Sequence, residues 1–199
     1  MFGGTWFSDS YDKWLKRGSP VDTTVTHLML KSSGITEIPP EIKNLQNLKV
    51  LVLSHNKIST IPPEIGELSK LLEIQLQHNH IMSVPPEFGN LRLLTQVYLD
   101  NNFISELPEE MENLQGLTIL TLNDNQLTHL FSNIGKLRNL RHLCIQNNNI
   151  CALPQSIYKI GGNMLFRLDS SLRSGPKPRT SWLTVYFDAE VDTKPACHF

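Results

Sequence analysis

The sequence predicts an α/β fold built as a curved, right-handed solenoid, with parallel strands on its concave face and extended or 3₁₀ segments on its convex face. Three observations predict it. A 23-residue pattern occurs six times without a gap. Each copy has apolar residues at the alternating spacing of a short strand, and each has asparagine or serine at its ninth position. No copy can bury its own apolar residues, so the copies must stack.

The six copies form rows that begin at Val25, Leu48, Leu71, Leu94, Leu117 and Leu140. Residues two apart on a strand point to the same side, so the fourth and sixth positions, Leu51 and Leu53 in the second row, should both point inward. Neighbouring rows should then place their strands about 4.8 Å apart in a parallel sheet.

The ninth position of the rows predicts a buried hydrogen-bonding ladder. It is occupied by Ser33, Asn56, Asn79, Asn102, Asn125 and Asn148. The chain turns inward after each strand and leaves backbone N–H and C=O groups away from water. An asparagine amide can donate to and accept from such groups in every row.

The convex side is predicted from two further apolar columns and a proline column. The apolar columns are Ile38, Ile61, Val84, Leu107, Leu130, Leu153 and Ile42, Ile65, Phe88, Met111, Ile134, Ile157. Proline follows the first column at 39, 62, 85, 108 and 154, which favours an extended or short 3₁₀ path. The fifth row has Phe131 there, so a local difference is expected.

The two ends of the solenoid need covers. We expect residues 1–24 to form an N-terminal capping segment with a short helix between Ser8 and Gly18. Residues 25–162 are the six repeats. Residues 163–199 are predicted to hold a degenerate seventh repeat, a strand-like C-terminal cap at "SWLTVYFDAEV" and a tail.

The stretch "VLVLSHNKISTIPPEIGELSKL" resembles the 23-residue leucine-rich repeats of the cytosolic Ras-group family, which includes the Ras suppressor protein. The resemblance covers Val25 to about Gly162. It implies a non-enzymatic adaptor whose partner is a Ras-family GTPase or a signalling or adhesion protein. The C-terminal stretch from Gly175 to Phe199 departs from that family's pattern.

The composition excludes several classes of function. The net charge is −1, without the clustered basic surface of a nucleic-acid binder. No apolar run approaches the roughly 20 residues of a membrane helix. The three cysteines lack paired spacing, and no Asn-x-Ser/Thr acceptor occurs. We therefore expect a cytoplasmic, monomeric protein with free thiols, no cofactor, no metal and no membrane insertion.

Strand side chains that do not enter the core should form the binding face, at positions three, five, seven and eight of each row. The expected protein-binding residues are Met29, Val50, Val52, Glu73, Gln75, His78, Gln96, Tyr98, Asp100, Ile119 and Asp124. Met29, Val50 and Val52 are predicted to make an exposed apolar patch. Tyr98, beside acidic residues, is the predicted anchor for a partner with a basic surface.

Other chemistries are weaker hypotheses. His55, His78 and His80 could suggest a metal, but further ligands are missing and solvated histidines are the simpler interpretation. Cys144 after His142 lacks an orienting acid for catalysis. "TVYF" is similar to a phosphatase-docking motif but is more simply a strand.

The sequence therefore predicts a non-enzymatic protein-interaction module. Two alternatives stay open: a structural subunit of a cytoskeletal or ciliary assembly, and a regulatory subunit of a phosphatase.

Overall fold

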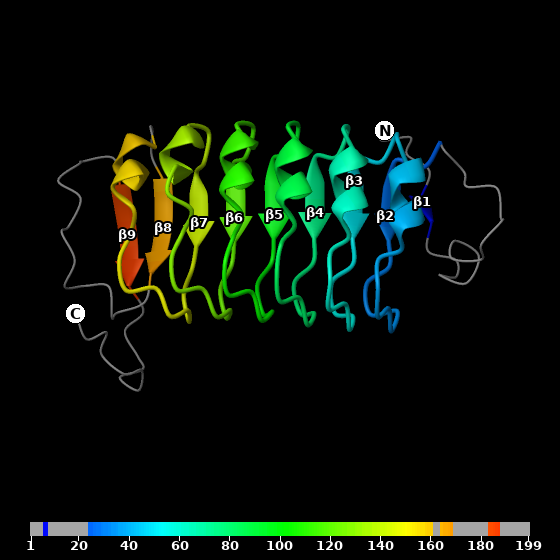
Figure 1. Ribbon diagram of the computed structural model, residues 1–199, viewed down its shortest axis with the longest axis horizontal. Helices are drawn as coiled ribbons and strands as arrows, with labels where there is room; N and C mark the ends of the chain where they lie inside the picture. The colour runs from blue at the N-terminus through cyan, green and yellow to red at the C-terminus, as the bar shows by residue number, and fades with distance from the viewer. Residues whose placement is uncertain (1–5, 8–23, 161–163, 169–182, 188–199) are drawn as a thin grey trace.

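One parallel sheet runs the length of the molecule (Figure 1). In the computed structural model the described residues are 6–7, 24–160, 164–168 and 183–187, with side chains described over 24–160. Within these residues the sheet has nine strands in chain order, β1 to β9. This open parallel arrangement confirms the predicted solenoid.

The strands are short and follow the repeat. They are β1 (Trp6–Phe7), β2 (His27–Met29), β3 (Val50–Val52), β4 (Glu73–Gln75), β5 (Gln96–Tyr98), β6 (Ile119–Thr121), β7 (His142–Cys144), β8 (Met164–Leu168) and β9 (Leu183–Phe187). From β2 to β8, paired residues lie 23 positions apart, as in Leu51 with Ile74 and Cys144 with Arg167. Between β8 and β9 the spacing changes, since Met164 pairs with Leu183, so the repeat no longer sets the register there.

The opposite side of each row carries a 3₁₀ helix. These helices are η1 (Pro40–Asn44), η2 (Pro63–Glu67), η3 (Pro86–Asn90), η4 (Glu109–Asn113), η5 (Ile134–Lys136) and η6 (Gln155–Lys159). An extended proline precedes five of them, for example Pro62 with φ −72° and ψ 148°. The row with Phe131 has the three-residue η5, and its first cap is Asn133 with ψ 26°. The predicted local difference of the fifth row is thereby confirmed.

Glycines let neighbouring helices approach backbone to backbone. A Cβ added at Gly66 would lie 2.3 Å from the carbonyl oxygen of Glu87, and one added at Gly135 would lie 2.0 Å from that of Ser156. No side chain fits in such a gap, so glycine is required where these helices touch.

The core is continuous along the rows. Inward-facing residues such as Leu51, Ile74, Val97 and Leu120 are fully buried, and the convex columns close over them. Each row thus covers the apolar face of its neighbours, as the repeat pattern requires.

The asparagine column forms the predicted ladder. Asn102 Oδ1 accepts from the backbone N–H of Ile81 at 3.0 Å. Its Nδ2 donates to the carbonyl oxygens of Leu76 at 3.1 Å and Leu99 at 3.0 Å. The equivalent bonds recur at Asn56, Asn79, Asn125 and Asn148. Each amide therefore joins its own row to the row before it.

The predicted capping helix at 8–18 and the C-terminal tail lie outside the described residues. Trp6–Phe7 adds β1 to the sheet beside β2. Within the described residues, no helix has the length and apolar character needed to cross a membrane.

Candidate functional site

The candidate binding face is the sheet surface turned away from the core. Position three and position five of each row lie on strands β2 to β7, and their side chains alternate with the buried position between them. The strand register determines which side chains are neighbours on this face, because each residue lies opposite the residue at the same repeat position in the adjacent rows.

The apolar patch expected at the first rows is smaller than predicted. Met29 is 40% exposed and Val50 is partly buried, but Val52 is only 4% exposed. Val52 is a buried apolar residue outside the contiguous core cluster, and it lies on β3 opposite Met29 and Gln75, which have longer side chains. The prediction that Val52 is exposed is therefore wrong, because short side chains on a crowded sheet are covered by longer neighbours.

Tyr98 lies in the middle of the face and is partly buried. It sits opposite Gln75 of β4 and Thr121 of β6. Its hydroxyl donates to Gln96 Oε1 at 2.8 Å. Burial raises the pKa of Tyr98, and the carboxylates of Glu73 and Asp100 raise it further. The phenol therefore stays neutral at physiological pH in a locally negative field.

The acidic residues near Tyr98 are held in place. Gln75 Nε2 donates to Glu73 Oε1 at 2.6 Å. Asp100 accepts from the Thr121 hydroxyl and, at 2.9 Å, from the backbone N–H of Asn123. These bonds fix the carboxylates and thereby pre-organise the negative field around the ring.

Position seven has a structural function that the sequence did not reveal. Asn123 Oδ1 accepts from the backbone N–H of Gln146 at 2.9 Å, which repeats the bond that Asp100 makes to Asn123. In the earlier rows this ladder is missing. Ser54 Oγ and Gln77 Oε1 are buried and have no hydrogen-bond partner among the described residues. In the sequence, Asp100 and Asn123 occupy position seven of consecutive rows, and this pair was the signal that could have predicted the ladder.

Position eight, where His78 and Asp124 were expected to bind, also has a backbone requirement. All six residues of this column have positive φ, between 55° and 58°: Ser32, His55, His78, Asn101, Asp124 and Asn147. Asparagine, aspartate and histidine are enriched in this left-handed conformation. The residue types of the column are therefore explained by the turn, whether or not a partner contacts them.

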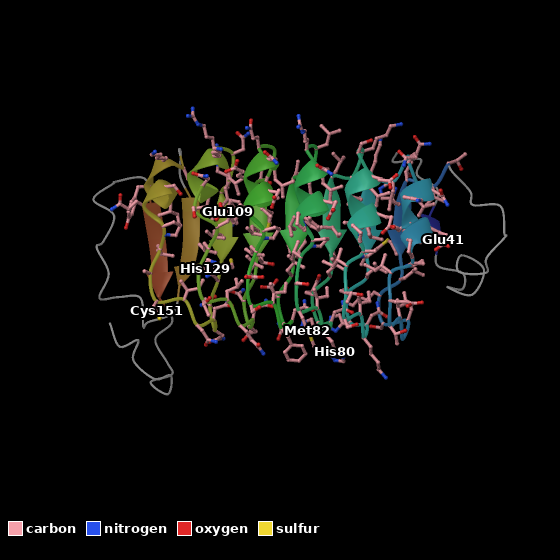
Figure 2. The ribbon with its side chains drawn as sticks, in the orientation of Figure 1. Glu41, His80, Met82, Glu109, His129 and Cys151 are labelled. Carbon is pink, nitrogen blue, oxygen red and sulfur yellow. The ribbon has the colours of Figure 1, made fainter. Side chains whose placement is uncertain are left out.

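The two aligned histidines of this column stack on each other. The rings of His55 and His78 have centroids 4.2 Å apart and an angle of 18° between their planes. Partial desolvation, then repulsion from His78 and Lys31, lowers the pKa of His55. His80 lies near the lower edge of the view in Figure 2, as Met82 does, and its ring centroid is 5.9 Å from that of Phe103.

The structure offers no metal centre in the part of the chain that it describes, since no three His, Cys, Asp or Glu side chains come together there. Cys144 is a buried free thiol next to Thr121, whereas His142 is exposed. Buried structural cysteines are usually unreactive as nucleophiles.

The expectation of three free thiols is wrong at Cys151. This residue is disulfide-bonded. Spacing alone could not show this, because a disulfide depends on how close two side chains come in space.

The eleven expected residues thus fall into three groups. Glu73, Gln75, Gln96, Tyr98 and Asp100 form one contiguous site on and just after β4 and β5, and Ile119 lies opposite Gln96 on β6. Met29 and Val50 lie towards the first rows, with Val52 buried between the two regions. His78 and Asp124 lie on the turns that follow the strands.

Comparison with known proteins points to one architecture. The family model described as Leucine rich repeat matches residues 23–81. A leucine-rich-repeat protein of Leptospira interrogans has a similar structure, with 32% identity and a TM-score of 0.56, over 74% of this chain and 44% of that one. No curated protein matches the chain at a significant level.

Two plant receptors are also similar. The leucine-rich-repeat ectodomain of the membrane receptor kinase GASSHO1/SCHENGEN3 from Arabidopsis thaliana, in complex with Casparian strip integrity factor 2, has 30% identity and a TM-score of 0.66, over 82% of this chain and 19% of that one. The plant peptide hormone receptor RGFR1, in complex with RGF2, has 25% identity and a TM-score of 0.66, over 83% and 28%.

This chain spans less than half the length of each of these proteins. The repeat period, the parallel sheet, the asparagine ladder and these similarities agree with one another. The described part of the chain is a leucine-rich-repeat solenoid.

Proposed function

We propose that the chain is a non-enzymatic protein-interaction module that binds a protein partner through the concave face of β3 to β6, with Tyr98 at its centre. The observation that carries the proposal is the fixed arrangement of Tyr98, Gln96, Glu73 and Asp100. An aromatic ring with a polar tip, surrounded by polar groups held in place, is the usual composition of an interface anchor.

The similar receptors support a binding function. GASSHO1/SCHENGEN3 and RGFR1 are both in complex with another molecule in their structures. The carboxylates of Glu73, Asp100 and Asp124 favour a partner that presents cationic or hydrogen-bond-donating groups.

Finer assignments rest on the sequence. The resemblance to the Ras-group family supports a scaffold in signal transduction, with a Ras-family GTPase or an adhesion protein as partner. The missing Asn-x-Ser/Thr acceptors support a cytoplasmic location, whereas the disulfide at Cys151 argues against one.

A thiol count tests the location argument. After unfolding without reductant, the disulfide predicts that one thiol, Cys144, reacts with a thiol reagent. Reaction of all three cysteines would restore the reduced, cytoplasmic interpretation.

A binding experiment tests the function itself. Proteins captured by the wild-type chain should be lost when Tyr98→Ala is used as bait, because truncation of an interface aromatic commonly costs about 2 kcal/mol or more of binding free energy. Phe103→Ala is the matched control, since Phe103 is an exposed aromatic on the edge, away from Tyr98. Equal capture by both variants and wild type would exclude the concave face as the binding surface.

A further inference from the structure

The convex face changes charge abruptly between the fourth and fifth rows. Position seventeen of the rows is occupied by Glu41, Glu64, Glu87, Glu110, Asn133 and Ser156. Position twenty is occupied by Asn44, Glu67, Asn90, Asn113, Lys136 and Lys159. Residues three apart on a 3₁₀ helix lie on the same face, so each pair of positions forms one surface. The first four rows therefore present carboxylates, and the last two present lysines with neutral polar groups.

The two changed columns meet in a hollow of about 750 Å³ between η5 and η6. Three cations line it, Lys136, Arg138 and Lys159, together with the amide and hydroxyl groups of Asn133, Asn139 and Ser156. No carboxylate is among its lining residues. Gly135 allows the close approach of the two helices, because a Cβ there would collide with the backbone of Ser156.

Most of the positive charge in this basic hollow is uncompensated. Lys136 is paired with Glu112 of η4 at 2.8 Å, and this hydrogen bond is the main reason that the pKa of Glu112 lies below its ordinary value. The side chains of Arg138 and Lys159 are exposed and make no hydrogen bond or ion pair with any described residue. The whole chain has a net charge of −1, so attraction of an anion to this region is a local property.

We propose that the basic hollow of η5 and η6 docks a short acidic segment of a protein partner, rich in aspartate and glutamate. Carboxylates would accept from the Arg138 guanidinium and the Lys159 ammonium, while the amide of Asn133 or Asn139 offers further donors.

The surroundings limit the length of the occupant. Glu112 of η4 contacts Lys136 at the border of the hollow, and Glu109 and Glu110 lie on the same helix. Their charge would repel a long polyanion such as a nucleic acid, which needs cations along its whole track. A segment of a few carboxylates can fit the cationic region without crossing the acidic rows.

The test is the binding of a fluorescein-labelled Asp/Glu-rich peptide to the full chain, followed by fluorescence anisotropy. The control peptide has Asn and Gln in place of the acids. The acidic peptide should bind and the neutral one should not. Binding should also weaken with salt, because the Debye length falls from about 30 Å at 0.01 M to about 3 Å at 1 M.

A matched pair of variants locates the site. Arg138→Glu with Lys159→Glu should weaken the acidic peptide on the order of tenfold or more. Arg92→Glu with Lys70→Glu makes the same change in net charge on exposed residues of the second and third rows, and Arg92 occupies the same repeat position as Arg138. This second variant should bind nearly as well as wild type.

Three results would overturn the proposal: no binding of the acidic peptide by wild type, full binding by the Arg138/Lys159 variant, or equal losses in the two double variants. Thermal melting checks that each variant folds. If the charge-reversal variant Arg138→Glu with Lys159→Glu does not fold, Arg138→Gln with Lys159→Gln is used in its place. Tyr98→Ala should keep full binding of the acidic peptide, which separates this surface from the concave face.

Discussion

The eighth and ninth positions of each row are neighbours in sequence but are constrained in different ways. The ninth is buried, and its amide bonds to the backbone of two rows, as Asn102 does with Ile81 and Leu99. The eighth is exposed, and the constraint that all its residues share is the backbone conformation, with φ of 55° at Asn101. Asparagine occurs in five of six rows at the ninth position and in two of six at the eighth, for two causes: buried hydrogen bonds in the first column and a left-handed turn in the second.

The largest expected effect concerns the ninth position. Asn102→Leu leaves the backbone N–H of Ile81 without its acceptor and removes the bonds that the amide donates to the carbonyl oxygens of Leu76, Leu99 and Asp100. We expect the free energy of unfolding to fall by about 3 kcal/mol, since one buried unsatisfied group costs about 1–3 kcal/mol. Denaturant unfolding measures it. The control Asn101→Gly should change stability much less, and similar losses in both variants would show that the two columns do not differ.

A smaller effect is expected at the eighth position. His78→Val puts a β-branched side chain at φ 58°, which should lower the free energy of unfolding by about 1–2 kcal/mol. His78→Asn keeps a residue type that tolerates this conformation and should be close to wild type. If the asparagine variant were as unstable as the valine variant, the histidine ring would matter more than the backbone.

Tyr98 provides a third comparison, because its own side chain is only partly buried and its backbone does not adopt the left-handed turn conformation. Tyr98→Ala should change the free energy of unfolding by only about 0.5 kcal/mol while it removes partner binding. A large loss of stability measured in the same unfolding experiment would assign Tyr98 to the packing of the sheet.

The smallest effect is a titration. The pKa of His55 lies below 6.5, so its protonation is less favourable in the folded state. The unfolded chain therefore binds a proton at His55 more readily than the folded chain does. The folded state keeps its full stability above the pKa of the unfolded chain and loses stability as the pH falls below it. His78→Asn should raise the pKa of His55 in an NMR titration, because it removes one repelling ring. An unchanged pKa would leave desolvation and Lys31 as the causes.

Most of the fold could be predicted from the sequence because the repeat fixes it at several levels. The period sets the strand register, the alternation of Leu51 and Leu53 sets the buried face, and Asn102 sets the turn. Each of these features depends on a row and its immediate neighbours, which are themselves copies of the same pattern.

The candidate site could be predicted only in part. Tyr98, Gln96 and Glu73 lie together as their columns indicate. The burial of Val52 depends on the lengths of Met29 and Gln75 in the adjacent rows, and no column pattern contains that information. The basic hollow was visible in the aligned columns as the loss of glutamate, but its concavity depends on how closely η5 and η6 pack.

The asparagine ladder also has a direction. Asn148 accepts from the N–H of Leu127 and donates to the carbonyl of Leu122, both in the preceding row, so each row seals the turn of the one before it. Loss of the first row would leave the asparagine bonds that seal the turns of later rows in place, whereas loss of the sixth would remove the bond from the N–H of Leu127 in the fifth row to Asn148. Shortening the protein from one end is therefore not equivalent to shortening it from the other, and fraying should advance more easily from the amino-terminal side.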